Sequence, residues 1–332
     1  MGASAFQIEA WVEYAIGVVI LLTRIVLRCW ARDTDWQGDD YFSILCIVFL
    51  TGESVMLELI GRWGSIVGIS DEVALSLTPD QKENIVKGSK ADIAGWCLYI
   101  SLIWCLKACM LFFYQRLTLD TRQRRLIIVA GVACICSYLA TIFVVLLRCL
   151  PFEKNWQVYP YPGDECATPG QIFLTLVITN VSTDLLILYI PLPLLWVLQA
   201  PLSKKIAYGI WLTTGIFVIV ASLLRCILSI KDANEVNVST IWAIRETVVG
   251  VISVNLPILG PLLIRKCKCL AATLSANSVS KDDQNSGQPS LITFGRAGEG
   301  IRLERLKKLG KYPLTSAGWT TVYSSSQEHM VG

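Results

Sequence analysis

An apolar stretch at residues 172–198 constrains the fold of this chain more than any other part of the sequence. Its only charged side chain is Asp184, which lies near its middle. A helix needs about 20 mainly apolar residues to cross the hydrocarbon core of a bilayer, so the stretch predicts a membrane-spanning helix. An aspartate at that depth costs roughly 2.5–3.5 kcal/mol on insertion scales. We therefore expect Asp184 to have a partner on a neighbouring helix.

Composition predicts a polytopic membrane protein and argues against several other classes. Hydrophobic residues make up 54% of the 332 residues and charged residues only 17%. The one histidine, His329, lies in a polar tail, which argues against a histidine metal site or a histidine general base. The net charge of +3 is spread over loops and tail rather than along one face, so nucleic acid is not an expected partner. We expect no enzyme activity, no metal and no cofactor.

Seven runs are long enough to span a bilayer, which predicts an all-α membrane protein with a seven-helix bundle over residues 11–264. The predicted spans cover residues 11–30, 39–60, 92–117, 125–147, 170–198, 205–230 and 240–264, and 61–91 is expected to be an outside loop.

Lysine and arginine are concentrated in the first, third and fifth connections and just after the last span. The positive-inside rule makes those faces cytoplasmic. The short N-terminus at residues 1–10 is then outside, and the polar tail at 265–332 is cytoplasmic. We expect a multi-pass protein of the plasma membrane or an endomembrane.

Two features of the predicted outside loops agree with that orientation. Cys149 and Cys166 bracket a loop rich in aromatic residues, proline and glycine, and they are the best disulfide candidates among the 12 cysteines. Cys97, near the outer end of the third predicted span, is the rival partner. Asn237 begins a glycosylation sequon in the sixth connection.

Charged residues recur at matching depths in the other predicted spans, if depth is counted at ~1.5 Å per residue. Lys107 lies close to the depth of Asp184 and of Glu53, so either carboxylate is a candidate partner. Arg225 and Glu246 share a depth in the outer part of the bundle and are expected to pair. A further charged group lies at the inner ends of the first two spans: Arg24, Arg28, Asp39 and Asp40.

These intramembrane charges have two interpretations. They are either structural links between helices, or a ligand site or switch whose ion pairs differ between two states. The candidates for ligand contact are Glu53, Lys107, Asp184, Arg225 and Glu246.

The pattern of motifs resembles the fungal rhodopsin-like family of integral membrane proteins, which includes fungal pathogenicity receptors and the membrane protein of the satratoxin cluster. The matching positions are, in chain order, Arg24, Arg28, Asp39, Asp40, Lys107, Tyr114, Gln115, Arg116, Leu117, Cys149, Pro151, Trp156, Cys166, Asn180, Asp184, Pro191, Pro193, Arg225, Trp242, Glu246 and Pro257. The resemblance implies a receptor-like seven-helix protein, and family members also occur in secondary-metabolite gene clusters.

Two functions follow as hypotheses. The first is a receptor-like sensor with an intramembrane polar cavity, which would bind a small-molecule or surface ligand and meet a cytoplasmic signalling partner. The second is an accessory or transport protein of a secondary-metabolite, or mycotoxin, gene cluster. A membrane enzyme is the least supported class, because the sequence shows neither a metal-ligand cluster nor a nucleophile arrangement.

Overall fold

The structure is a computed structural model that describes residues 5–30, 36–117, 121–163, 166, 170–192, 213, 215–224, 226–227, 240–257 and 259–260. All of these residues belong to one compact unit, Met1–Ala271. Arg225, the sequon at Asn237 and the predicted cytoplasmic tail lie outside the described residues.

Five helices in the described part of the chain are long and apolar enough to cross a membrane. They are α1 (Ala5–Trp30), α2 (Gly38–Trp63), α4 (Pro79–Leu117), α5 (Thr121–Leu147) and α7 (Gly170–Tyr189). Shorter helical segments follow at Gly215–Leu224 and at residues 240–257. All regular secondary structure among the described residues is helical, as predicted. The count of seven spans and the outside N-terminus stay predictions.

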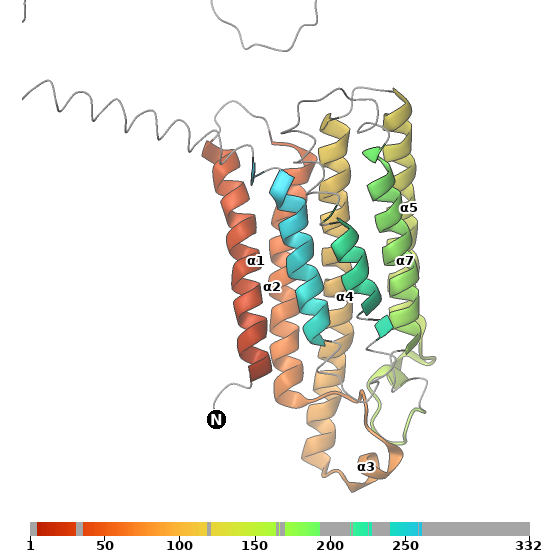
Figure 1. The fold of residues 1–332 in the computed structure, drawn as a ribbon. Helices are drawn as coiled ribbons and strands as arrows, with labels where there is room; N and C mark the ends of the chain where they lie inside the picture. Colours follow the sequence, from red (N-terminus) through yellow and green to blue (C-terminus); the bar gives the residue numbers. More distant parts are fainter. Residues whose placement is uncertain are drawn as a thin grey trace, which may run out of the picture. The chain divides into compact units, whose positions relative to one another are not determined.

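The bundle is organised around α4, against which α2, α5 and α7 pack, while α1 packs against α2 (Figure 1). The helix of residues 240–257 runs in the same direction as α1. Arg245, near its start, contacts Glu9 near the start of α1, and Asn255, near its end, contacts Arg24 near the end of α1. The two helices therefore lie side by side along most of their length.

Two apolar clusters form the core on different sides of α4. One joins Trp104 of α4 to Ile127 of α5, and the other joins Leu102 of α4 to Leu50 of α2. Large apolar side chains also cover the outside of the bundle, and Ile135 of α5 is 62% exposed. An apolar exterior of this kind suits helices that face lipid.

The connection at residues 61–91, predicted as a loop, is largely helical. α3 covers Asp71–Ser76, and α4 begins at Pro79, well before the predicted third span. The Thr78 N–H donates to Gln81 Oε1 at 2.9 Å, and the Gln81 N–H donates to Thr78 Oγ1 at 3.4 Å. This reciprocal cap, with proline as the first helical residue, starts the helix early.

α4 is too long to lie wholly within a membrane. Its 39 residues measure about 58 Å at ~1.5 Å per residue, against about 30 Å for a hydrocarbon core. Its first turns pack in a small apolar cluster in which Ile85 joins Ile66, Ala74 and Val158. The region between α2 and the membrane-spanning part of α4 is therefore an ordered structure with its own core.

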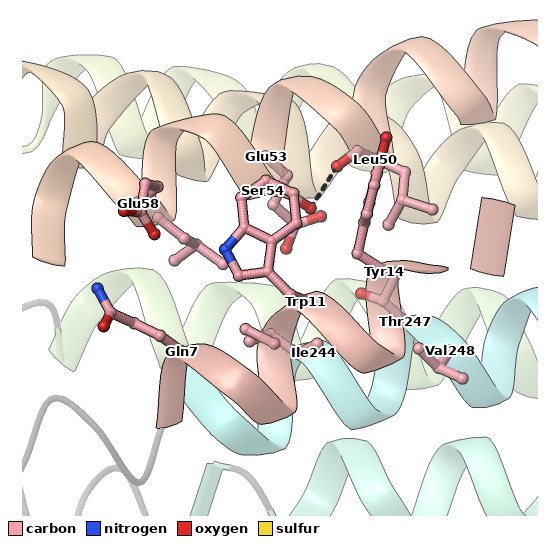
Figure 2. A pocket seen from close by; sticks show the side chains of 12 residues that line it. Gln7, Trp11, Tyr14, Leu50, Glu53, Ser54, Glu58, Ile244, Thr247 and Val248 are labelled. Carbon is pink, nitrogen blue, oxygen red and sulfur yellow. Dashed lines mark hydrogen bonds between the residues drawn. The ribbon is translucent and has the colours of Figure 1, made fainter. Parts of the chain in front are cut away.

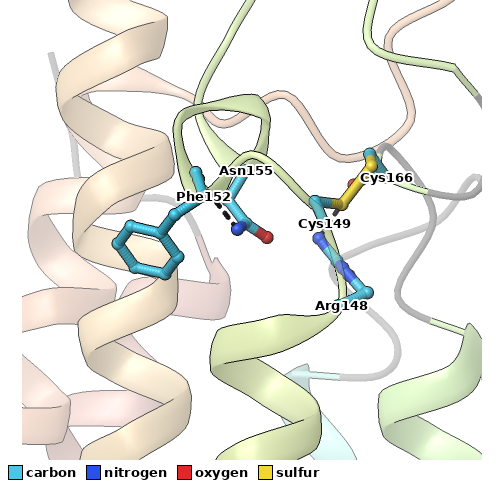
Figure 3. Close-up of a disulfide and its surroundings, with 5 residues drawn as sticks. All are labelled: Arg148, Cys149, Phe152, Asn155 and Cys166. Carbon is cyan, nitrogen blue, oxygen red and sulfur yellow. Dashed lines mark hydrogen bonds between the residues drawn. A yellow bond between two sulfur atoms is a disulfide. The ribbon is translucent and has the colours of Figure 1, made fainter.

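The predicted disulfide is confirmed, and it fixes the loop that follows α5. Cys149 and Cys166 are bonded with their Cα atoms 5.8 Å apart (Figure 3). Cys97, the rival candidate, is a free thiol. Arg148 Nη2 donates to the Cys166 carbonyl at 2.8 Å. Burial lowers the pKa of the Arg148 guanidinium from its ordinary value, and the charge of Asp92 opposes that shift.

The same loop packs on the protruding start of α4. It contains a short 3-10 helix, η1 (Phe152–Asn155), and the Phe152 and Trp156 rings meet edge to face at 5.0 Å. Lys90 of α4 lies over the Trp156 ring at 5.1 Å, and Lys82 lies over the Tyr159 ring at 5.0 Å. Cation–π contacts therefore hold the aromatic loop against α4.

Candidate functional site

Lys107 and Asp184 form an ion pair between α4 and α7 in the interior of the bundle. Lys107 is 5% exposed, so its charge depends on protein partners. Besides Asp184, its Nζ donates to the Asn180 carbonyl at 3.0 Å and to Thr183 Oγ1 at 2.9 Å. Of the two carboxylates predicted as partners of Lys107, Asp184 is the one that the structure brings to it.

A second group of buried polar side chains adjoins this pair. Glu246 accepts hydrogen bonds from the Tyr99 hydroxyl at 2.9 Å and from Asn180 Nδ2 at 3.0 Å. Asn180 Nδ2 also donates to Ser222 Oγ at 2.9 Å. The network therefore joins α4, α7, the Gly215–Leu224 helix and the helix of residues 240–257.

Four residues of these two polar groups border a cavity of about 90 Å³. Lys107, Asp184, Asn180 and Glu246 line it together with mainly apolar side chains. Two acceptors that belong to these lining residues, Asp184 Oδ2 and Asn180 Oδ1, are buried and have no hydrogen-bond partner among the described residues. The cavity combines apolar walls with a few polar groups, which is the usual composition of small-molecule sites.

Glu53 does not line this cavity, contrary to the sequence prediction that grouped it with Lys107. It lines a separate cavity of about 20 Å³ between α1, α2 and the helix of residues 240–257 (Figure 2). Trp11 and Tyr14 of α1 and Thr247 of that helix point toward it in the figure. Gly52, the neighbour of Glu53, faces the Leu98 side chain of α4. Leu98 precedes Lys107 by nine residues, or about 14 Å at ~1.5 Å per residue, so the depth counted within the predicted spans was wrong for Glu53.

The charges near the end of α1 and at the start of α2 form one buried cluster. Arg24, which is fully buried, pairs with Asp39 at 2.8 Å, and Arg28 pairs with Asp39 and Asp40 at 3.3 Å each. The two aspartates occupy the first turn of α2, where negative charge is favoured by the helix dipole. Arg24 Nη1 also donates to Asn255 Oδ1 at 3.2 Å. The charge cluster (Arg24, Arg28, Asp39 and Asp40) therefore contacts the helix of residues 240–257.

That helix connects the cavity with the charge cluster. Glu246 and Asn255 lie about 14 Å apart along its axis at ~1.5 Å per residue. Arg245, the neighbour of Glu246 in the sequence, pairs with Glu9 of α1, Nη2 to Oε1 at 2.5 Å.

Several groups that complete the site were not among the predicted site residues. Formal charge was the sequence signal for intramembrane partners, and neutral donors and acceptors do not carry it. They are Tyr99, Thr183, Ser222 and Asn255. Polar residues inside otherwise apolar spans were the available signal. Arg225, the predicted partner of Glu246, lies outside the described residues, and so that pairing stays a prediction.

The comparison with protein families identifies the bundle. The fungal rhodopsin domain family matches residues 23–265 of the chain, which is most of its length. The chain belongs to this family. The resemblance drawn from the motifs is thereby confirmed, and the protein is a fungal rhodopsin-domain membrane protein.

Two curated relatives of this rhodopsin-domain protein are informative. A SAT4 family membrane protein of Emericella nidulans is 27% identical over 206 residues, which cover 60% of this chain and 52% of the relative. The chain thus spans about half the length of that relative. The polyenoic acids biosynthesis gene cluster protein Ba17b of Metarhizium anisopliae is 19% identical over 339 aligned residues, 98% of this chain and 90% of the relative. No solved structure matches the chain.

Proposed function

We propose that this rhodopsin-domain protein is receptor-like, and that a small molecule binds in the cavity beside Lys107 and Asp184. The observation that carries the proposal is the helix of residues 240–257, which bears Glu246 at the cavity and Asn255 at the charge cluster. A ligand that changes the hydrogen bonds of Glu246 acts on the same helix that contacts Arg24. One element with a contact at each site is the physical basis for coupling between them.

The chemistry of the cavity favours a ligand that donates hydrogen bonds. Asp184 Oδ2 and Asn180 Oδ1 are acceptors without a partner among the described residues. Two carboxylates, Asp184 and Glu246, and one ammonium, Lys107, line the described part of the cavity. Because the other lining groups are mostly apolar, we propose a small amphipathic amine or alcohol as the ligand.

Thermal stability of the purified full-length protein tests this ligand class. A panel of small amphipathic amines and alcohols is compared with carboxylic acids of the same carbon skeleton. A ligand at 100 times its Kd stabilises the folded state by about 2.7 kcal/mol, which a melting curve resolves. The proposal predicts stabilisation by a donor and none by its carboxylate analogue, and stabilisation by the carboxylates alone would contradict it.

Two serine variants locate the binding site. Ser253 lines the cavity, so Ser253→Leu fills it and should remove the stabilisation. Ser182 of α7 is exposed, and its hydroxyl donates to the Thr179 carbonyl one turn earlier in the same helix, at 3.2 Å. Ser182→Leu is therefore the matched control and should respond like the wild type. Equal responses in both variants would place the ligand elsewhere.

The coupling itself is tested at a residue that does not line the cavity. Asn255→Ala removes the contact with Arg24 and should change the affinity for the ligand about fivefold or more, since allosteric coupling energies are typically about 1–3 kcal/mol. Thr51→Ala, which removes the Tyr14–Thr51 hydrogen bond between α1 and α2, is the control. An unchanged ligand affinity in Asn255→Ala would argue against coupling between the cavity and the charge cluster, and so against a receptor-like function.

A role in a secondary-metabolite gene cluster is the second candidate, and the name of the Metarhizium anisopliae relative favours it. Deletion of the gene in its own fungus separates the two functions. Loss or intracellular accumulation of a metabolite, together with uptake of that metabolite by proteoliposomes, would support an accessory or transport role. An unchanged metabolite profile with a lost response to an external amine or alcohol would support the receptor-like role.

A further inference from the structure

A groove of about 580 Å³ runs along the outer side of α4, between α2 and α5. Its residues on α4 recur at three- and four-residue intervals from Ser101 to Gln115, so one face of that helix forms the floor. The stripe is about 21 Å long at ~1.5 Å per residue, which exceeds half of a hydrocarbon core of about 30 Å. Ile128 and Ile135 line the groove and are themselves exposed, so the groove is open on the lipid-facing side.

Small residues leave this space unfilled. A Cβ atom placed on Gly131 of α5 would meet no atom within 4 Å apart from the backbone of its own helix and its chain neighbours, so no close helix contact requires glycine there. Glycine in a helix interior is destabilising relative to alanine, which makes an unpacked glycine notable. Ala108 of α4 lies in the same groove. The rings of Phe42 (α2) and Phe112 (α4) stack with their centroids 5.5 Å apart and form the wall of the groove near Gln115.

The two ends of the groove differ in polarity. At one end Ser101 shares a hydrogen bond with the Tyr138 hydroxyl at 3.1 Å, and the Trp104 indole N–H donates to Ser137 at 2.9 Å. At the other end Arg124 and Gln115 line the groove. None of the groove-lining side chains in the described part of the chain is acidic. The groove is therefore apolar along its length, with a cationic group at one end.

We propose that this groove binds one anionic phospholipid. An acyl chain lies along the apolar floor between Ala108 and Gly131, and the headgroup phosphate lies beside Arg124 at the membrane face where α4 ends and α5 begins. The positive charge of Arg124 complements an anionic headgroup, and the bilayer supplies the ligand directly to the open side. The site is separate from the cavity beside Lys107, because no residue lines both.

Native mass spectrometry of the full-length protein in detergent tests the proposal. The probes are phosphatidylserine and phosphatidylcholine with identical oleoyl chains. The wild type should retain one phosphatidylserine about fivefold more strongly than phosphatidylcholine, the preference expected from one basic side chain at a membrane surface. Arg124→Gln should abolish this preference.

Arg125→Gln is the matched control for the headgroup contact. Arg125 is the exposed neighbour of Arg124 on α5 but does not line the groove, so its replacement should leave the preference unchanged. Equal losses in the two variants would mean that the basic surface attracts anionic lipid without a defined site, and would overturn the proposal. Equal retention of phosphatidylserine and phosphatidylcholine by the wild type would also overturn the proposal.

Filling the groove tests the acyl-chain site. Gly131→Phe should reduce retention of both lipids at least tenfold, whereas Val132→Phe, at an exposed position outside the groove, should not. If Gly131→Phe lowers the folded yield, Ala108→Leu fills the same space from α4. Unchanged retention in a folded filling variant would refute the site. Retention of an added sterol in place of phospholipid, insensitive to Arg124→Gln, would refute the assigned ligand.

Discussion

Replacing Asp184 with asparagine tests how much the buried ion pair stabilises the bundle. The change leaves Lys107, which is 5% exposed, with the Asn180 carbonyl and the Thr183 hydroxyl but without its counter-charge. Breaking a buried pair by removing one partner typically costs about 3–5 kcal/mol. In a folded unit of this size that corresponds to a fall in Tm on the order of 10 °C. Melting curves of the detergent-solubilised protein measure it.

An exposed ion pair of the same protein provides the control. Arg62 and Glu58 pair at 3.0 Å on the surface of α2, and the Arg62 side chain is 67% exposed, so Glu58→Gln should cost at most about 1 kcal/mol. Lys107→Met combined with Asp184→Asn removes both buried charges and should recover more than half of the loss. Equal losses in Asp184→Asn and Glu58→Gln, or strictly additive losses in the double variant, would refute the reasoning.

Three further predictions concern other parts of the fold. Cys166→Ser should lower stability by roughly 3 kcal/mol, because the disulfide closes a loop with a sequence separation of 17 residues; a non-reducing peptide map that links Cys97 instead would contradict the pairing. Thr78→Ala should remove the cap of α4 at a cost of about 1 kcal/mol, and amide exchange should become faster in the first turns of α4 alone. Faster exchange throughout the bundle would contradict local capping. Arg24→Met should leave Asp39 and Asp40 without enough positive charge nearby and should lower the free energy of unfolding by about 3–5 kcal/mol in a melting experiment. Arg116→Met, at an exposed position, should be nearly neutral, and similar losses of stability in the two variants would contradict a structural charge cluster.

The membrane helices were predictable because their signal is local. A run of about 20 apolar residues identifies a span whatever surrounds it, so α1, α2, α5 and the start of α7 lie where hydropathy predicts them. The disulfide was predictable for a related reason, because Cys149 and Cys166 bracket one short loop. The extramembrane start of α4 was missed because its apolar content is low, although threonine, proline and glutamine at 78, 79 and 81 carried a capping signal.

The candidate site was only partly predictable, because it depends on helix rotation as well as depth. Counting residues placed Lys107, Asp184 and Glu53 at similar depths, yet the structure brings Lys107 to Asp184 and leaves Glu53 near the level of Leu98, about 14 Å from Lys107 along α4. The direction of a side chain around its helix is set by packing with neighbours distant in sequence. Neutral partners such as Asn255 carry no charge signal, and only the packed bundle shows that Asn255 contacts Arg24.

The central claim is that the cavity and the charge cluster are coupled through the helix of residues 240–257. Amide hydrogen exchange in the first turn of α2, which does not line the cavity, tests it most directly. A stabilising amine or alcohol should change exchange at residues 38–42 in the wild type, and Asn255→Ala should abolish that change while the exchange response of the cavity helices remains. A response that stays confined to the cavity helices in the wild type, with residues 38–42 unaffected by a saturating ligand, would contradict the claim.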